Sequence, residues 1–287
     1  MSLDRELLAL AETTVREAGA VVAAGRSRAI EVTDTKTSPT DIVTEVDLAS
    51  ERLIRERILD ARPSDGFVGE EGADVAGSSD VVWVADPIDG TVNFLYGIPQ
   101  FAVSLAARVG GVVVAGVVHN PISGETFTAV RGEGARLGDR AVAVSGCTDV
   151  AAALIGTGYA YRADVRRHQA VEMARLLPRV RDVRRLGSAA LDLCFVASGR
   201  LDGYVERGLQ PWDLAAGGLI ASEAGARVAG LGGAAASETL VVAAPEALFD
   251  RLHDLLVETG FGDWPLEDRH PADGPVAAVS GQRPDEP

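Results

Sequence analysis

A nine-residue run that follows a short apolar stretch limits the possible folds of this chain more than any other segment. Residues 80–85 read Asp-Val-Val-Trp-Val-Ala, which is typical of a short buried strand. The next nine residues read Asp-Pro-Ile-Asp-Gly-Thr-Val-Asn-Phe. This order predicts Asp86 and Asp89 at the end of the strand, on a turn fixed by proline, with Gly90 and Thr91 at the start of a short helix.

This segment combines two groups that a phosphate-cleaving metal site needs. Mg²⁺ takes oxygen ligands, usually one or two carboxylates together with water and phosphate oxygens. The first N–H groups of a helix have no partner within the helix, so they can bind a phosphate beside the metal. Asp86 and Asp89 would supply the carboxylates, and Gly90 and Thr91 the amides. Taken alone, however, such a segment is more often an ordinary surface turn than a metal site.

Three further acidic clusters accompany this segment. Residues 69–72 read Gly-Glu-Glu-Gly at the end of an apolar stretch, and residues 40–47 carry acids at a loop-to-helix junction. Residues 211–217 place Asp213 at the start of a helix rich in small residues. Each cluster alone could be a helix cap or a turn. Four clusters in one chain favour a metal-assisted phosphatase.

These segments resemble the signature blocks of the inositol monophosphatase family, and the likeness is strongest to bacterial members of actinobacterial type. The resemblance covers about residues 5–260. The matching blocks follow the family's order at about its spacing, and they are residues 36–41, 44–47, 69–71, 86–94, 187–193 and 212–217.

The resemblance implies a layered αβαβα sandwich of the inositol monophosphatase and fructose-1,6-bisphosphatase type, with the active site between two halves. Hydrophobic periodicity predicts an α+β first half and, from the alternation of strands and helices, an α/β second half. The expected helices are residues 3–25, 47–60, 166–177, 188–199, 212–224 and 245–258. The expected strands are residues 80–85, 100–108, 111–119, 125–130, 152–157, 182–184, 202–206 and 239–243.

A composition shift near residue 145 predicts a domain boundary. We expect residues 1–145 to form an N-terminal half that carries most metal ligands. Residues 146–262 would form a C-terminal half that carries Asp213 and the substrate-facing residues. Residues 263–287 are polar and rich in proline, which predicts a disordered tail.

The resemblance also implies the metal ligands. Glu70, Asp86 and the carbonyl of Ile88 would hold a first Mg²⁺, and Asp86, Asp89 and Asp213 a second. A third, weaker Mg²⁺ would use Glu70 and water. A pair of metal ions can activate water and stabilise the leaving oxygen of an in-line displacement.

Catalytic roles are implied in the same way. Thr91 and Asp47 correspond to the pair that orients the attacking water and helps to deprotonate it, beside Glu70. A threonine alone is a poor base, so this role requires the neighbouring carboxylate. The amides of Gly90 and Thr91 correspond to the groups that bind the phosphate.

Substrate recognition would use carboxylates and a stretch of backbone. Glu206 corresponds to the family's acceptor of hydrogen bonds from substrate hydroxyls. Lys36, the only lysine of the chain, and Asp41 are further candidates in a matching loop, although Lys36 could equally be a solvated surface residue. We interpret Asp192 as a helix-surface or capping residue. The implied substrate-binding residues are Asp89, Gly187, Ser188, Ala189, Glu206 and Asp213.

Composition excludes several classes of partner. The net charge is −15, so the chain has no basic surplus with which to bind nucleic acid or an anionic membrane. No apolar run is long enough to span a bilayer. Two cysteines make no disulfide framework, which predicts a reducing, cytoplasmic location. The resemblance implies a homodimer, for which residues 102–105 and the helix within residues 152–177 are candidate faces, although they could equally be core.

Three functions remain open. The first is Mg²⁺-dependent hydrolysis of myo-inositol monophosphate, with the Li⁺ inhibition that the resemblance implies. The second is the same metal chemistry on fructose 1,6-bisphosphate, 3′-phosphoadenosine 5′-phosphate, histidinol phosphate or NADP. Glu206 favours a polyol, because a nucleotide pocket would need aromatic and basic residues nearby. The third is a mainly protein-binding, regulatory role, as the link of some bacterial relatives to the transcription machinery suggests.

Overall fold

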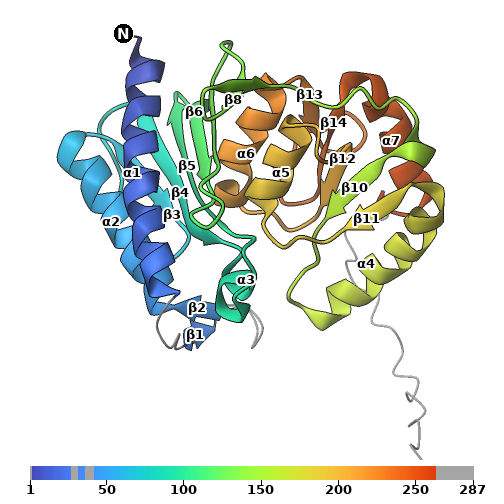
Figure 1. The fold of residues 1–287 in the computed structure, drawn as a ribbon, viewed down its shortest axis with the longest axis horizontal. Coiled ribbons are helices and arrows are strands. Elements are labelled where there is room, and N and C mark those ends of the chain that lie inside the picture. The colour runs from blue at the N-terminus through green and yellow to red at the C-terminus, as the bar shows by residue number, and fades with distance from the viewer. Residues whose placement is uncertain (1, 27–31, 36–41, 263–287) are drawn as a thin grey trace, which may run out of the picture.

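The computed structural model describes residues 2–26, 32–35 and 42–262. Lys36, Asp41 and the expected tail over residues 263–287 lie outside these described residues. Within them, helices and two large sheets alternate in five layers (Figure 1). The helices are Leu3–Gly25 (α1), Glu45–Ala61 (α2), Thr91–Tyr96 (α3), Ala163–Leu176 (α4), Ala189–Ala197 (α5), Pro211–Glu223 (α6) and Glu246–Glu258 (α7), with short 3₁₀ turns at Val150–Ala152 and Leu177–Arg179.

The larger sheet has seven strands in the order β3-β4-β5-β6-β7-β8-β9, which is also their order in the chain. Only β3 and β4 pair in parallel, and every other neighbouring pair is antiparallel. The expected hairpin at Gly110 and Gly111 is present, and both glycines have positive φ. The strands are Gly66–Gly69 (β3), Val81–Asp89 (β4), Ala102–Val109 (β5), Val112–His119 (β6), Thr126–Val130 (β7), Ala135–Leu137 (β8) and Arg140–Val142 (β9).

The smaller sheet has five strands in the order β11-β10-β12-β14-β13. Strand β10 pairs in parallel with β11 and β12, whereas β14 runs antiparallel to both β12 and β13. Its strands are Leu154–Thr157 (β10), Asp182–Arg184 (β11), Gly203–Glu206 (β12), Ala226–Ala229 (β13) and Val241–Pro245 (β14). A separate two-stranded sheet pairs Val32–Thr35 (β1) with Ile42–Thr44 (β2).

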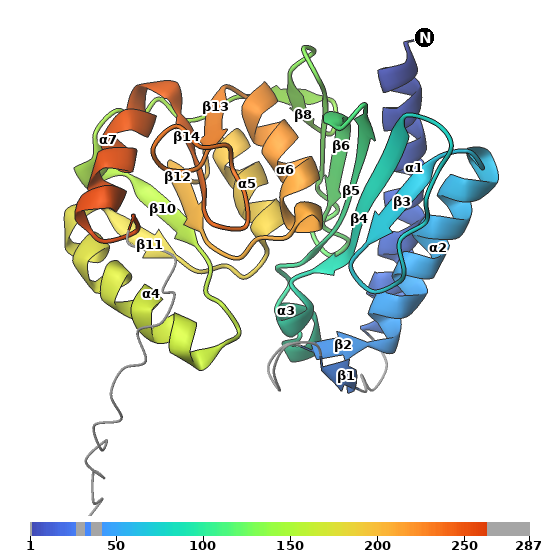
Figure 2. The same ribbon diagram turned by 180° about the vertical axis from the view of Figure 1, so that it is seen from behind.

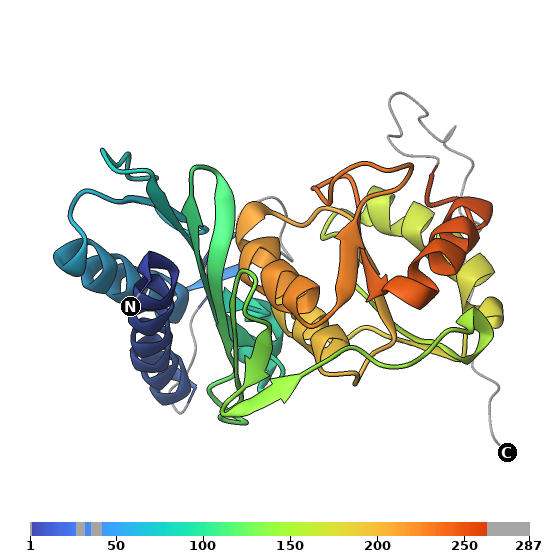
Figure 3. The ribbon, with the colours of Figure 1, turned by 90° about the horizontal axis from the view of Figure 1, so that it is seen from above.

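Four apolar clusters join the five layers. Helices α1 and α2 cover the outer face of the larger sheet, α5 and α6 lie between the two sheets, and α4 and α7 cover the far face of the smaller sheet (Figures 2 and 3). The expected layered sandwich is therefore confirmed. Representative members of the four clusters, taken in the order of the layers, are Leu7 with Trp83, Phe127 with Ile220, Leu193 with Val241, and Ile155 with Leu252.

Helix α5 corrects our interpretation of Asp192. This residue was expected on a helix surface or at a cap, but its side chain is only 1 % exposed. Because α5 lies between two sheets, both of its faces are packed, and eight of its nine residues are buried. A helix that is apolar all round is typical of such a central position.

The segment from Asp86 to Asp89 is also different from the predicted turn. Strand β4 continues to Asp89, but the chain gains one residue against β5, since Asp86 pairs with Ser104 and Asp89 with Ala102. Pro87 has no N–H group to give to the ladder, which explains a bulge at this place. The bulge turns both aspartates toward the same end of the sheet.

The structure bears on two expectations, one about a dimer face and one about membrane-spanning segments. Residues 102–105 lie in β5 and are at most 1 % exposed, so they are core rather than a dimer face. Among the described helices, none is both long enough and apolar enough to cross a membrane.

Candidate active site

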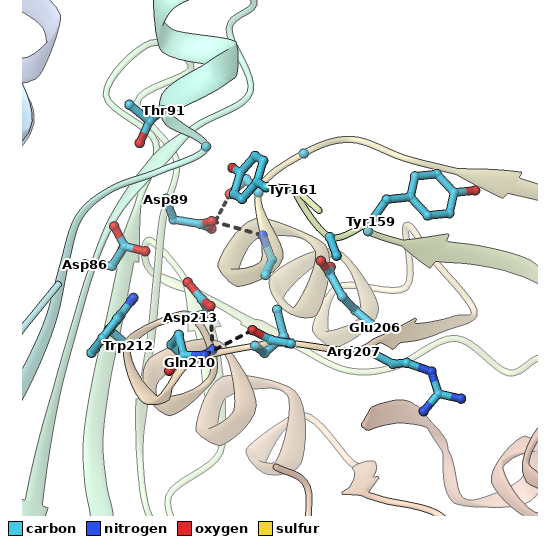
Figure 4. A pocket seen from close by; sticks show the side chains of 18 of the residues that line it. Asp86, Asp89, Thr91, Tyr159, Tyr161, Glu206, Arg207, Gln210, Trp212 and Asp213 are labelled. Atoms are coloured by element: carbon cyan, nitrogen blue, oxygen red, sulfur yellow. Dashed lines mark hydrogen bonds between the residues drawn. The ribbon is translucent and has the colours of Figure 1, made fainter. Parts of the chain in front are cut away.

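A cavity of about 640 Å³ opens at the end of β4, between the two sheets (Figure 4). It brings together side chains and backbone from β4 and from the starts of α3, α5 and α6, together with the end of β12. Among its lining residues are eleven that the sequence analysis proposed: Glu70, Asp86, Ile88, Asp89, Gly90, Thr91, Gly187, Ser188, Ala189, Glu206 and Asp213.

Three carboxylates form the acidic centre of this cavity. Asp86, Asp89 and Asp213 each offer an oxygen, and these oxygens lie within 4.8 Å of one another. Asp86 and Asp89 are buried, and Asp213 is half-buried. Burial raises the pKa of Asp86 and Asp213 well above the ordinary value, and repulsion among the carboxylates raises it further. Buried oxygen ligands that repel one another fit a divalent cation, which would remove the repulsion.

Asp86 is oriented by the backbone of the bulge. Its Oδ1 accepts a hydrogen bond of 3.0 Å from the N–H of Ile88. The hydroxyl of Ser50 on α2 donates to the carbonyl of Pro87 over 3.1 Å, which ties the bulge to the helix layer. Glu70 follows β3 and lies against Asp86, where its charge and its hydrogen bond both raise the pKa of Asp86.

Asp89 caps helix α5 from a distant part of the chain. Its Oδ2 accepts from the Ser188 hydroxyl over 2.5 Å and from the N–H of Ala190 over 2.7 Å, while Oδ1 accepts from the N–H of Ala189 over 3.2 Å. These donors partly offset the burial that raises the pKa of Asp89 to about 6. Ser188 and Ala189 were expected to face the substrate. They do line the cavity, but their contact with Asp89 was not predicted.

Asp213 lies in the first turn of α6 and is fixed by that helix's own start. Its Oδ2 accepts from the N–H of Gln210 over 2.7 Å, as in a capping box. The preceding Pro211 lies at the first position of the helix, where its missing N–H costs nothing. The sequence pattern that suggested a helix start is therefore confirmed.

Asp47 lies behind Thr91 and outside the cavity lining. The Thr91 hydroxyl lies 3.1 Å from Oδ1 of Asp47 and 3.0 Å from the carbonyl of Ile88. Oδ2 of Asp47 accepts from the backbone N–H and the hydroxyl of Thr44, which caps α2. Burial, together with the charge of Glu70, raises the pKa of Asp47 to about 6 against the effect of these hydrogen bonds.

Gly90 permits the close approach of the two halves at the head of α3. Its φ of 101° is left-handed, and a Cβ there would lie 2.9 Å from the carbonyl oxygen of Gly187 and 3.1 Å from that of Gln100. A side chain at this position would be both strained and crowded. The glycine of the nine-residue block is therefore required by its backbone, whatever its amide binds.

The cavity also contains residues that the sequence analysis missed. All but Trp212, which lies in α6 and within a matching block, come from loops that lie near the cavity only after folding, and no local pattern marks them as site residues. Their tyrosines and arginines weaken the argument that a nucleotide would find no aromatic or basic groups here. They include Tyr159, Tyr161, Arg162, Arg185, Arg207, Gln210, Trp212 and Glu238.

The raised pKa values predict how pH and metal affect stability. The ordinary pKa of an Asp carboxyl is 3.8, whereas burial raises the pKa of Asp47 and of Asp89 in the folded protein to about 6. The folded, metal-free state therefore binds more protons between these values, and the free energy of unfolding should fall as pH rises through this window.

Mg²⁺ should stabilise the protein above the window, by about 2.7 kcal/mol at a hundredfold excess over Kd, and much less near pH 4. Thermal unfolding with EDTA or with Mg²⁺ at the two ends of the window would test this. A pH-independent effect of Mg²⁺ would contradict it.

Comparison with known proteins agrees with the geometry. The model of the inositol monophosphatase family matches residues 3–260. "Inositol-1-monophosphatase SuhB" of Mycobacterium tuberculosis is 54 % identical over 202 residues, which cover 67 % of this chain and 70 % of that protein. "Nus factor SuhB" of Pasteurella multocida is 42 % identical, with 87 % of this chain and 95 % of that protein covered.

A solved structure gives the same result for the fold. The extragenic suppressor protein SuhB from Bartonella henselae superposes with a TM-score of 0.82 at 35 % sequence identity. The match covers 88 % of this chain and 98 % of that one. With a family match over nearly the whole described chain and an acidic cavity between the two sheets, the chain belongs to the inositol monophosphatase family, a family of phosphatases.

Proposed function

We propose that this protein is a Mg²⁺-dependent phosphomonoesterase that hydrolyses myo-inositol monophosphate to inositol and phosphate. The observation that carries the proposal is the cluster of Asp86, Asp89 and Asp213, next to the hydrogen-bonded pair of Thr91 and Asp47. The names of the mycobacterial relatives support the choice of substrate. The cavity volume of about 640 Å³ is in the ordinary range for small-molecule sites.

The metal ligands would be Glu70, Asp86, the Ile88 carbonyl, Asp89 and Asp213. Bound Mg²⁺ supplies Lewis-acid stabilisation of phosphate charge and lowers the pKa of a coordinated water. The three aspartates are held in place by hydrogen bonds from backbone N–H groups, so little reorganisation of the side chains would be required when a metal ion binds.

Thr91 and Asp47 would handle the proton of the attacking water. A hydroxyl that donates to Oδ1 of Asp47 keeps its lone pairs free to accept from water. The water's proton can then pass through the Thr91 hydroxyl to Oδ1 of Asp47 as the nucleophile forms. Asp47 must be ionised to accept it, so activity should decline as pH falls through the pKa of this carboxyl, which is about 6.

Glu206 would bind the alcohol part of the substrate. It lies at the end of β12 on the wall of the cavity and is half-buried. Its carboxyl can accept a hydrogen bond from a ring hydroxyl, and a substrate without that hydroxyl would leave it unpaired. Such a contact selects polyol esters over simple phosphate esters.

A nucleotide ester is the second candidate. Tyr159, Tyr161 and Trp212 lie on the cavity wall (Figure 4), and aromatic side chains can stack on a base. Arg162 and Arg185 also line the cavity, and a guanidinium can pair with a second phosphate. The same metal chemistry would then act on 3′-phosphoadenosine 5′-phosphate or NADP. Fructose 1,6-bisphosphate and histidinol phosphate stay in the comparison as small esters.

Phosphate release from a panel of these esters tests the proposal. Each ester would be supplied with Mg²⁺, with EDTA and with Mg²⁺ plus Li⁺. We expect the highest kcat/KM for inositol 1-phosphate, loss of activity with EDTA and inhibition by Li⁺. A preference for a nucleotide ester would keep the metal roles and reject the polyol. No turnover of any ester would reject the proposal.

A mainly protein-binding role can be tested separately. The name of the Pasteurella relative raises this alternative. A variant without catalysis, Asp89→Asn, would be compared with the wild-type protein for its ability to support growth of a strain that lacks the gene. Full rescue by the inactive variant would favour the binding role, and no rescue would favour catalysis.

A further inference from the structure

The carboxyl of Glu206 is held by a buried tyrosine on its own strand. Tyr204 and Glu206 are two residues apart on β12, so their side chains lie on the same face of the sheet. The Tyr204 hydroxyl donates a hydrogen bond to Oε2 of Glu206. Tyr204 is fully buried, and burial raises the pKa of its phenol well above the ordinary value, so the hydroxyl stays protonated and remains a donor.

Two glycines make room for this pair, one in the neighbouring strand β10 and one just after its end. Gly156 of β10 is the register partner of Tyr204, and Gly158 follows two residues later, beside Glu206. A Cβ at Gly156 would lie 3.2 Å from the Tyr204 ring. A Cβ at Gly158 would lie 1.9–2.1 Å from all three carboxyl atoms of Glu206, which is far inside contact distance. The carboxyl therefore lies directly on the backbone of Gly158.

A side chain on the opposite face of the sheet fixes the register between β10 and β12. Thr157, between the glycines, donates from its hydroxyl to the carbonyl of Val205 over 2.8 Å. Val205 is the residue between Tyr204 and Glu206, and the pairing of Thr157 with Val205 holds the glycines opposite the two side chains. The position of the Glu206 carboxyl thus depends on one donor and on the absence of one methyl group.

We propose that Tyr204 is a positioning residue for substrate recognition. By donating to Oε2 while Gly158 supports the carboxyl from below, it leaves Oε1 of Glu206 as the acceptor for a ring hydroxyl of a polyol phosphate. This inference rests on the proposed function, because it concerns how that site distinguishes a polyol from a simple ester. Tyr204 is not a catalytic residue, since it acts only through Glu206.

Tyr204→Phe is the variant that tests this role. Phenylalanine keeps the buried ring and removes only the donor. We expect KM for inositol 1-phosphate to rise roughly tenfold while kcat changes little, as is typical when a uniform binding contact is weakened. Hydrolysis of p-nitrophenyl phosphate, which has no ring hydroxyl, should stay within about twofold of wild type. The matched control is Tyr96→Phe, because the Tyr96 side chain is 76 % exposed on α3. This substitution should leave kcat and KM for both substrates unchanged.

Two further variants separate positioning from a general structural effect. Gly158→Ala should push the carboxyl aside and cause at least the same selective loss for inositol 1-phosphate. In a double-mutant cycle with Glu206→Ala, which removes both acceptor oxygens, the effect of Tyr204→Phe should largely disappear, because the two residues act as one contact. All variants would be measured in the full-length protein with Mg²⁺.

The experiment distinguishes failure of the role of Tyr204 from failure of the proposed function. Equal losses on both esters, an additive cycle, or an unchanged KM would overturn the role of Tyr204 while the proposed function stands. If wild-type protein hydrolyses p-nitrophenyl phosphate but not inositol 1-phosphate, the proposed function fails and the inference fails with it. Selective, non-additive loss supports both.

Discussion

Asp89→Asn is expected to reduce phosphatase activity by at least about 10³-fold. The substitution removes a charged oxygen from the acidic cluster and also directs an NH₂ group toward the hydroxyl of Ser188 or the N–H groups of Ala189 and Ala190. Without metal, the variant should be about as stable as wild type, because loss of repulsion among the carboxylates offsets the unpaired donor. It should lose most of the rise in Tm that Mg²⁺ gives to wild type.

The control for this variant is a carboxylate just before the same strand. Asp80→Asn changes an exposed carboxylate that immediately precedes β4, at the end far from the cavity, and should alter kcat/KM by less than about twofold. Phosphate release and thermal unfolding with and without Mg²⁺ measure both effects. An Asp89→Asn variant that keeps a tenth of its activity, or its full response to Mg²⁺, would show that Asp89 is not a metal ligand.

Thr91→Val is expected to lower kcat by about 10²- to 10⁴-fold, the usual range for loss of a general acid–base group. Valine has nearly the same shape as threonine and removes only the hydroxyl that bonds Asp47 and the Ile88 carbonyl. KM should change little, because the backbone amide of residue 91 remains. Thr91→Ser, which keeps the hydroxyl, should stay within about tenfold of wild type and serves as the matched control.

Steady-state kinetics of both variants, with Asp47→Asn and the double substitution, would test the pair. Because Thr91 and Asp47 are expected to act as one proton path, the double variant should be little slower than either single variant. Multiplying effects would mean that the two residues act independently. Activity of Thr91→Val near that of the serine variant would exclude the hydroxyl from catalysis.

Local patterns predicted the regular elements well. Helix α1 begins and ends where its apolar spacing indicated, because Leu7, Ala11, Val15 and Val22 must all face one sheet. The tight hairpin between β5 and β6 followed from two adjacent glycines. Six of the described strands, each of three or four residues, were missed, since so short a run carries little periodicity that distinguishes it from a loop: β1, β2, β3, β8, β9 and β13.

The sequence likewise predicted some features of the candidate site and not others. Residues on matching blocks, such as Asp86 and Asp213, were named from the sequence and meet in the structure. The contact that orients Asp89 was not predicted, because Ser188 is separated from it by 99 residues of chain. Such contacts depend on how the layers stack, and that information is not carried by any short segment. Asp192 was misjudged for the same reason, since it is buried by the packing of α5 between the two sheets.

The position of Asp213 late in the chain has a consequence for synthesis. The seven strands of the larger sheet and both of their aspartates precede residue 143, whereas α6 begins at Pro211. During translation, the first sheet can pair and pack against α1 well before the third carboxylate has left the ribosome. The proposed cation site is therefore completed only when the central helices have docked, so binding of a metal ion there would report the docking of α6 rather than the formation of the first sheet alone.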